Sequence, residues 1–445
     1  MAYVNVVSLL SIAVLRSTGN GPTNPVIWIE GYTNPADGGE GMFVYAPGDT
    51  SSPDNGGTVI VTTSGGYRYY RETNKGPLNI CWFGASTNAG VDSSPALNAA
   101  LAALPAAGGQ ILVPTGTFTL NSAITYTTPS SSAIFSLAIV GLGADVSNLY
   151  WANATNGIAL NVSLASHSVH VRDLSIVTSQ SCGYTGILVT LTSIQNQFEQ
   201  NDFINVNFRG RSVNAQYWGN GLIISGLSNV TYNNVLYFGG NASGTGIVIQ
   251  TGPASSTFCI VHNLTDCGFF FGQNGLVYGN GVQGVTVSQC NFTGGVTGII
   301  QPTGPGGFQL TVQGSQFNTT QNQIYLQTTI AGLSIIGNLF FVPNATGANY
   351  AGVNLSTNFI RGVTIQGNVF LGSPPASGQP LTGAGVITGP NTYDGVVSGN
   401  SFYDVQVGVN LTGATNWNVL GNVYDTTVIT KVIPGSGNSV GVATA

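Results

Sequence analysis

Residues 79–120 read NICWFGASTNAGVDSSPALNAALAALPAAGGQILVPTGTFTL and carry strand, loop, helix, turn and strand signals in that order. Asp92 stands just before a Ser-Ser-Pro sequence, where its carboxylate can accept hydrogen bonds from the free amides of a first helical turn. Pro105 and Gly108 end the helical pattern. The apolar residues between these signals recur at helical spacing and form one apolar face: Leu97, Ala100, Leu101 and Leu104. A short amphipathic helix has to cover an apolar surface, which the rest of the chain must supply.

This stretch resembles a known family. The sequence WFGA, the Asp-capped alanine-rich helix and the sequence GGQILVPTGTFTL are similar to the opening segment of the pectate-lyase-like right-handed parallel β-helix superfamily, which includes phage tailspikes and capsule depolymerases. The resemblance implies that a helix over residues 93–104 caps the N-terminal end of the solenoid. It covers about a tenth of the chain and concerns architectural residues, so it indicates the fold and leaves the chemistry open.

The composition excludes several classes of function. Only 5% of the 445 residues are charged, against a usual ~25%, and the net charge is −6 with nine Lys plus Arg. Nucleic-acid binding by phosphate neutralisation is therefore not expected. No stretch is long enough to insert into a membrane, and residues 5–15 lack the features of a signal peptide. We expect no metal and no cofactor, because His167, His170 and His262 lack metal-ligand spacing and no phosphate loop occurs.

Two strand patterns recur along the chain and predict an all-β solenoid. The first has the form Val-X-Ile-X-Gly-Asn-X-Phe, and its copies end at Phe292, Phe317, Phe340, Phe370, Phe402 and Tyr424, at intervals of 25, 23, 30, 32 and 22 residues. The second begins with Gly before aliphatic residues, at Gly186, Gly221, Gly246, Gly275, Gly352 and Gly408. Each repeat winds one coil that pairs with the next at ~4.8 Å. About ten coils predict a rod of roughly 50 Å.

Stacked coils also predict ladders of like residues. Asn338, Asn368, Asn400 and Asn422 share one register and should bond amide to amide, inside or at a corner. Cys267 and Cys290 lie 23 residues apart in a second register. Their Cα atoms should come within disulfide range, although stacking alone explains this proximity and we favour a buried thiol pair.

The patterns divide the chain into four parts: a β-rich head or neck region over residues 1–78, the capping helix and first strands over 79–135, the parallel β-helix over 136–430, and a C-terminal tail over 431–445. In the first part, four acidic residues occupy Gly-rich turns: Asp37, Glu40, Asp49 and Asp54. These residues could bind a cation, but Asp-Gly and Asp-Asn-Gly sequences form turns in the first place.

Carboxylates are the candidate catalytic residues, because glycoside hydrolysis needs two of them in one cleft. From residue 136 onward carboxylates are few, and their densest group is Asp173, Glu199, Asp202 and Asp266, with Arg172, Arg209, Arg211 and His262 near in sequence or register. Carboxylates on adjacent coils lie ~5 Å apart, and those two coils apart ~10 Å, near the retaining and inverting spacings. The alternative is structural, since Asp173, Asn205, Asn234 and Asp266 share a register and would form an Asp/Asn ladder.

Substrate binding is predicted for Arg209 and Arg211 and for the sequence NAQYWGN at residues 214–220, which interrupts the strand pattern. Tyr217 and Trp218 in this sequence offer aromatic faces for sugar stacking, while packing of Trp218 in the core explains it equally well.

These observations predict a tailspike-like protein that binds, and depolymerises, a bacterial surface polysaccharide, with a hydrolase favoured over a lyase. The resemblance implies a homotrimer at the tail or baseplate of a virion. A non-catalytic adhesin or structural protein of the same fold, and a secreted microbial polysaccharide-degrading enzyme, remain alternatives.

Overall fold

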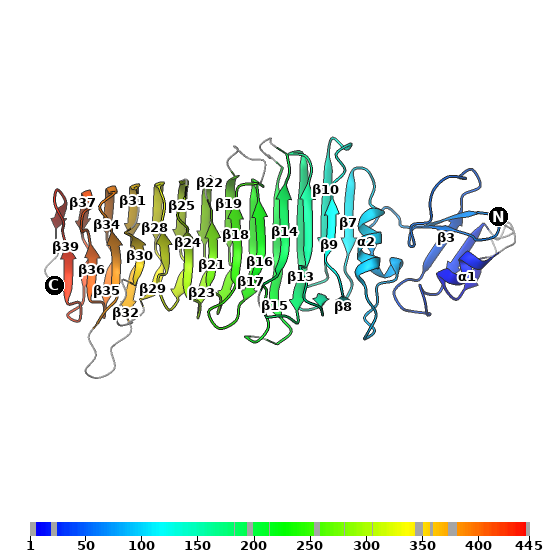
Figure 1. Ribbon diagram of the computed structural model, residues 1–445, viewed down its shortest axis with the longest axis horizontal. Coiled ribbons are helices and arrows are strands. Elements are labelled where there is room, and N and C mark those ends of the chain that lie inside the picture. Colours follow the sequence, from blue (N-terminus) through cyan, green and yellow to red (C-terminus); the bar gives the residue numbers. More distant parts are fainter. Residues whose placement is uncertain are drawn as a thin grey trace.

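The protein is a rod with a small separate sheet at its N-terminal end (Figure 1). The computed structural model describes residues 6–18, 25–181, 183–193, 199–212, 214–252, 259–279, 281–304, 306–342, 350–356, 359–372 and 381–441. Two parallel sheets of 23 and 12 strands run the length of the rod. The predicted right-handed parallel β-helix is confirmed.

The N-terminal region forms a five-stranded sheet with its own core. Its strands follow the order β1-β2-β3-β5-β4, and Ile12, Leu15, Ile29 and Phe43 are buried against one another. The elements are β1 (Val7–Leu9), α1 (Ile12–Ser17), β2 (Val26–Ile29), β3 (Gly41–Tyr45), β4 (Val59–Val61) and β5 (Arg68–Arg71).

The acidic turns of this region bind backbone amides. Asp37 accepts hydrogen bonds from four backbone N–H groups, and Asp49 accepts from Ser51 and Ser52. Asp54 accepts from Gly56 and forms an ion pair with Arg16. These contacts support the interpretation of the acidic residues as turn formers.

The capping helix α2 (Ser94–Ala102) follows β6 (Leu78–Asn79) and the 3-10 helix η1 (Ile80–Phe83). Asp92 accepts from the amide of Ser94, as predicted, and also from that of Asn121, which belongs to the first coil. Leu97, Ala100 and Leu101 are buried in the core of the β-helix. The helix is shorter than the predicted 93–104, because the chain turns after Ala103 toward Pro105.

Each coil of the rod contributes to three faces, which we call A, B and C. Face A contains β7 (Gly108–Leu112), β10 (Phe135–Val140), the first halves of β13 (His167–Thr178), β15 (Asn201–Gly210) and β17 (Val230–Phe238), then β19 (Cys259–Thr265), β22 (Val282–Ser288), β25 (Gly307–Gln313), β28 (Ile330–Ile336), β31 (Ile360–Gln366), β34 (Thr392–Ser398), β37 (Thr415–Leu420) and β40 (Ser439–Gly441).

Face B follows face A after one corner. It contains β8 (Gly116–Leu120), β11 (Ser147–Trp151), the second halves of β13, β15 and β17, then β20 (Gly268–Phe270), β23 (Asn291–Thr293), β26 (Gln316–Asn318), β29 (Leu339–Val342), β32 (Val369–Gly372), β35 (Ser401–Tyr403) and β38 (Val423–Tyr424).

Face C is the 12-stranded sheet, which closes each coil. It contains β9 (Ile124–Thr127), β12 (Ile158–Val162), β14 (Thr185–Leu191), β16 (Asn220–Ser225), β18 (Thr245–Gln250), β21 (Asn274–Tyr278), β24 (Thr297–Gln301), β27 (Ile324–Leu326), β30 (Ala351–Leu355), β33 (Ala384–Thr388), β36 (Val407–Asn410) and β39 (Thr430–Ile433). Strand pairing continues across both predicted divisions, 135/136 and 430/431. β7, β8 and β9 precede the first and pair with later coils, while β39 spans the second and β40 pairs onto β37 beyond it.

A column of stacked aromatic rings fills the core behind face B. Phe269, Phe292, Phe317, Phe340, Phe370, Phe402 and Tyr424 stack with ring centroids 4.7–5.1 Å apart. The rings press against the glycines that begin the face C strands. A Cβ on Gly275 would lie 2.4 Å from the ring of Phe292, and one on Gly385 would lie 2.3 Å from that of Phe402. The sequence pattern that ends in Phe and the pattern that begins with Gly therefore reflect one packing contact, in which each ring lies against a face C glycine.

The predicted asparagine ladder lies inside the corner between faces A and B. The Asn368 side chain donates to Asn400 Oδ1 at 2.9 Å and to the Ile335 carbonyl at 2.9 Å. Its own oxygen accepts from the backbone amide of Asn338 at 2.9 Å. Asn422 continues the ladder below Asn400. All four amides are buried and satisfied.

The outside of this corner is a column of left-handed residues. Its members are Asp173, Asn205, Asn234, Asp266, Gln289, Gly314, Gly337, Gly367, Gly399 and Gly421, with φ between 50° and 64°. Asn, Asp and Gly tolerate this conformation best, so the backbone alone explains most of these residue types.

Four of the five cysteines are described, and all four are free and buried: Cys81, Cys259, Cys267 and Cys290. The expected thiol pair of Cys267 and Cys290 is confirmed. Burial raises the pKa of the Cys267 thiol well above its usual range. Cys182 lies outside the described residues. In the described part of the chain, no helix has the length and apolar character that crossing a membrane would require.

Candidate functional site

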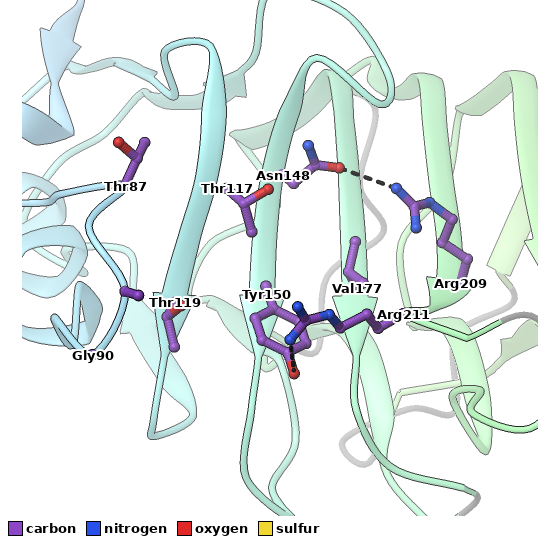
Figure 2. A pocket seen from close by; sticks show the side chains of 10 residues that line it. Thr87, Gly90, Thr117, Thr119, Asn148, Tyr150, Val177, Arg209 and Arg211 are labelled. Carbon is purple, nitrogen blue, oxygen red and sulfur yellow. Dashed lines mark hydrogen bonds between the residues drawn. The ribbon is translucent and has the colours of Figure 1, made fainter.

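An open groove on face B, close to the capping helix, is the candidate site (Figure 2). Its volume is about 490 Å³. Outward side chains of β8, β11 and β13 form its floor, the loop before α2 forms one end, and two arginines form the other. It is lined by Thr87, Ala89, Gly90, Thr117, Thr119, Asn148, Tyr150, Val177, Arg209 and Arg211.

Arg209 and Arg211 extend along the rod toward β11 (Figure 2). Arg209 donates from Nε to Asp145 Oδ1 at 2.9 Å and from Nη2 to Asn148 Oδ1 at 3.3 Å. Arg211 Nη1 lies 3.5 Å from the Tyr150 hydroxyl, and its guanidinium lies 5.3 Å from the centre of the Tyr150 ring. The pair is partly neutralised by Asp145, whose side chain is 58% exposed, so the groove keeps positive charge in a chain of net charge −6.

Beyond the arginine end of the groove, aromatic side chains follow on face B toward the C-terminal end. Val177 pairs with Arg209, and the same outward row continues through Phe238 and Phe270. These two half-buried rings stack with centroids 5.1 Å apart. Arginines, a tyrosine, amides and aromatic faces in one line are the groups that bind a chain of sugars carrying carboxylates.

Asp202 lies away from this groove, on the outside of face A. It accepts from His170 Nδ1 at 2.7 Å and from Arg172 Nε at 2.6 Å. Burial alone would raise its pKa, but the hydrogen bonds from Arg172 and His170 outweigh burial and lower the pKa to about 2. This environment favours a permanently ionised carboxylate rather than a general acid.

The other predicted carboxylates occupy separate places. Asp173 and Asp266 belong to the left-handed corner column, and Asn205 Nδ2 donates to Asp173 Oδ1 at 2.8 Å. This supports the ladder interpretation for Asp173. Glu199 is exposed just before β15. His262 is fully buried in the core, where burial lowers its pKa to about 3. Residues that are close in the sequence therefore separate onto face A, the corner, face B and the interior.

The aromatic pair of residues 217 and 218 is not an exposed platform. Trp218 is 1% exposed, donates from Nε1 to the Ile176 carbonyl at 2.9 Å, and packs edge-on against Trp151. The core-packing alternative therefore holds for Trp218. Tyr217 is half-buried, and its ring lies against Gly240.

Sequence reasoning identified Arg209 and Arg211 but missed their neighbours in the groove. Asn148 and Tyr150 alternate with buried Leu149 and Trp151 in the sequence SNLYW, which was a readable signal for outward side chains. The strand register that places β11 two coils before Arg209 could not be predicted, because the early copies of the repeat match the sequence pattern poorly.

The fold and the groove together define a parallel β-helix protein with an open groove on one outer face. Residues 8–74 match the family model described as a phage tail protein small four-stranded β-sheet domain. No curated protein sequence matches the chain.

Solved structures of phage tailspikes are similar in fold. Tailspike protein 2 of an Escherichia coli O157:H7 bacteriophage is 18% identical with a TM-score of 0.62, and the match covers 88% of this chain and 51% of that protein. The gp42 tailspike of an Acinetobacter phage is 14% identical with a TM-score of 0.60, covering 96% of this chain and 74% of that one. The gp49 tailspike of an Acinetobacter baumannii bacteriophage, a capsular polysaccharide depolymerase, is 14% identical with a TM-score of 0.53, covering 95% and 75%. This chain thus spans about half the length of the Escherichia phage tailspike.

Proposed function

We propose that this chain is a tailspike-type virion protein that binds an acidic bacterial surface polysaccharide in the face B groove and cleaves it. The groove of Arg209, Arg211 and Tyr150 is the observation that carries the proposal. The match of residues 8–74 to a phage tail domain supports attachment to a tail, and the depolymerase among the structural neighbours supports cleavage.

An acidic sugar fits the charges of the groove. Two of the nine Lys and Arg residues of the chain point into it, and Arg211 makes no ion pair in the described part of the protein. A sugar carboxylate can form a charge-assisted bidentate contact with a guanidinium, which is stronger than the hydrogen bonds that the hydroxyls of a neutral sugar accept.

The described residues around the groove favour elimination over hydrolysis. Hydrolysis needs two carboxylates, whereas Asp145 is the one carboxylate that these residues place beside the arginines, and it is paired with Arg209. In β-elimination, an arginine neutralises the uronate carboxylate while a base removes the adjacent C–H proton and the glycosidic C–O bond breaks. In the proposed step the Tyr150 oxygen beside Arg211 accepts the C–H proton, the C–H electron pair forms the new C=C bond, and the glycosidic oxygen takes the proton from Tyr150 as it leaves.

The test is a panel of acidic and neutral capsule polysaccharides, with binding, release of reducing ends and ultraviolet absorbance of unsaturated uronate measured together. We expect binding of acidic polysaccharides, and cleavage with absorbance, both lost in an Arg209→Ala/Arg211→Ala variant. New reducing ends without absorbance would instead indicate hydrolysis. Binding without cleavage would indicate a non-catalytic adhesin, and preference for neutral polysaccharides would contradict the proposal.

We further propose that three copies associate along the corner between faces A and B at the C-terminal half of the rod. Exposed apolar side chains flank this corner: Ile336, Val369, Leu420 and Val423. Between them the column consists of glycines, which allow backbones to approach closely. Sedimentation equilibrium should give three times the chain mass of 45.7 kDa, and a Val369→Glu/Val423→Glu variant should sediment as a monomer. A monomeric wild-type protein would contradict this.

A further inference from the structure

A cluster on the outside of face A contains an arrangement that the groove does not use. In β13, His167, Val169 and Val171 point into the core, so Ser168, His170 and Arg172 point outward. Register places Asp202 of the next coil opposite His170, and Ser136 of the preceding coil opposite Ser168.

The contacts in this cluster form one chain from a hydroxyl to a carboxylate. Ser168 Oγ lies 3.2 Å from His170 Nε2. His170 Nδ1 lies 2.7 Å from Asp202 Oδ2. This is the order of nucleophile, base and orienting carboxylate that activates a serine, and it is recognised by geometry rather than by fold.

The charges fix the tautomer that such an arrangement needs. Arg172 binds Asp202 with Nε and Nη2, which keeps the carboxylate ionised. An ionised Asp202 holds the imidazole proton on Nδ1, so that Nε2 is left as the acceptor for the Ser168 hydroxyl. The side chain of His170 is 20% exposed, and Ser168 keeps 9% of its surface open beside the exposed Ser136.

A second pair of a nucleophile and a histidine shows what an inert arrangement looks like. Cys259 Sγ lies 3.1 Å from His262 Nε2, and Tyr232 contacts the other ring nitrogen. All three are buried in the core, where burial raises the pKa of Cys259 to about 12 and lowers that of His262 to about 3. The face A cluster differs because it is outward and keeps an ionised partner.

We propose that Ser168, His170 and Asp202 form a serine-hydrolase site for carboxylic esters of sugar hydroxyls, such as O-acyl groups on the bound polysaccharide. The ester reaction needs no polysaccharide, but the identity of the natural ester rests on the proposed function. The two sites lie on different outer faces of one coil region, so one would trim acyl groups while the other holds the chain.

The reaction balances with water alone. Ser168 Oγ bonds to the carbonyl carbon as its proton passes to His170 Nε2. The C–O bond to the sugar then breaks, and the sugar oxygen takes that proton. Water attacks the acyl-serine, again giving a proton to Nε2, and the carboxylic acid leaves while Ser168 regains its hydrogen.

The oxyanion donors have to be side chains. The strand ladders with β10 and β15 engage backbone amides of β13, and the Val169 amide donates to Asn201 Oδ1. The Ser136 hydroxyl, by contrast, lies 3.0 Å from Ser168 Oγ. Loss of one such donor lowers kcat by about 10²-fold or more.

The experiment uses the full-length chain with a fluorescent alkyl fluorophosphonate and a short-chain nitrophenyl ester. We expect the phosphonate on the Ser168 peptide by mass spectrometry, and ester turnover that falls about 10³-fold in Ser168→Ala and His170→Ala. Ser334→Ala is the matched control, because Ser334 lies in the same outward row as His170 with no histidine opposite. Thermal melting shows that each variant is folded.

The outcomes separate this site from the groove. Ser168→Ala should still bind and cleave deacylated polysaccharide. Ester turnover in a wild-type protein that binds no polysaccharide would contradict the proposed function but support the hydrolase site. A folded wild-type protein without label on Ser168, or a Ser168→Ala variant with wild-type ester turnover, would overturn the hydrolase site.

Discussion

At the scale of single residues, charge is informative because the chain uses so little of it. Arg211 contacts the Tyr150 ring face, and Arg209 reaches Asp145 and Asn148, so both guanidinium groups are held over the groove rather than free in solvent. Held cations lose less side-chain entropy when a ligand binds.

Arg211→Ala should weaken binding of an acidic polysaccharide about 10- to 100-fold, because a charge-assisted contact contributes roughly 1.5–3 kcal/mol. Titration calorimetry at two salt concentrations measures this, and the loss should shrink at high salt. Arg361→Ala is the control. Arg361 is an exposed arginine on β31 that lies over the Phe359 ring, and several coils separate β31 from the groove. Equal losses in both variants would mean that binding follows overall charge and not the groove.

Asp202→Asn should lower stability in a pH-dependent way. The folded pKa of Asp202 is about 2, below its usual value of 3.8, so the ionised form stabilises the fold above pH ~4 by about 2 kcal/mol. This contribution is lost as the pH falls from ~4 to ~2. The difference in urea unfolding free energy between wild type and Asp202→Asn should therefore vanish toward pH 2. A difference that stays constant with pH would show that the ion pair contributes nothing.

At the scale of elements, the sequence was most informative where the stacking repeats. The asparagine ladder, the coil repeat and the thiol pair were predictable, because like residues stack when coils stack. The hydrogen bond from the Ser94 amide to Asp92 was also predictable, although Ser93 and not Asp92 occupies the N-cap position. The corner column shows the limit of that reasoning. Asp173 and Asp266 occupy positions with a left-handed φ, which favours Asp for its backbone conformation. From the sequence alone, such an Asp cannot be distinguished from a catalytic Asp. The groove joins residues about 60 apart in the sequence, and only the register reveals it.

Asn368→Ala should destabilise the rod by about 2–4 kcal/mol. It leaves the buried backbone amide of Asn338 without its acceptor and removes the side-chain donor to Asn400 Oδ1, which keeps the backbone amide at position 368. Each unsatisfied buried group costs roughly 1–3 kcal/mol. Asn418→Ala on the exposed side of β37 is the control and should change stability little. The free energies of unfolding in urea are compared for the two variants. Similar losses in both would show that the asparagine ladder does not stabilise the rod.

Leu97→Ala in α2 should cost about 2–5 kcal/mol, since Leu97 is fully buried against the first coil. Exposure of that coil should also promote association end to end, because its strands present unpaired edges. Asn98→Ala on the same helix is only half-buried and serves as the control. Light scattering during heating detects the association, and a Leu97→Ala protein that melts and scatters as Asn98→Ala does would argue against a capping role.

At the scale of the whole molecule, two hydrophobic cores are separate, and a buried cation is one of the contacts between the two regions. Arg71 donates to the carbonyls of Gly39, Glu40 and Gly57, and its guanidinium lies 5.0 Å from the ring of Trp82 in η1. Burial lowers the pKa of Arg71 to about 10, which keeps it charged at neutral pH. The contact orients the N-terminal sheet on the rod without joining the cores.

Removal of residues 1–74 should therefore leave a folded β-helix with unchanged polysaccharide affinity. Circular dichroism, melting and the same calorimetric titration test this, with the full-length chain as reference. Loss of binding by a folded truncated protein would show that the N-terminal sheet contributes to the groove.

The inner contacts of the coils leave the connections free to differ in length. The aromatic stack recurs in consecutive coils from Phe269 to Tyr424, and the asparagine ladder in the last four of them. Yet β32 ends at Gly372 and β33 begins at Ala384, while only three residues separate β35 from β36. Outward rows and connections can therefore change while inward positions stay constant. An exchange of whole coils at their boundaries would replace the outer surface and still produce a chain that folds.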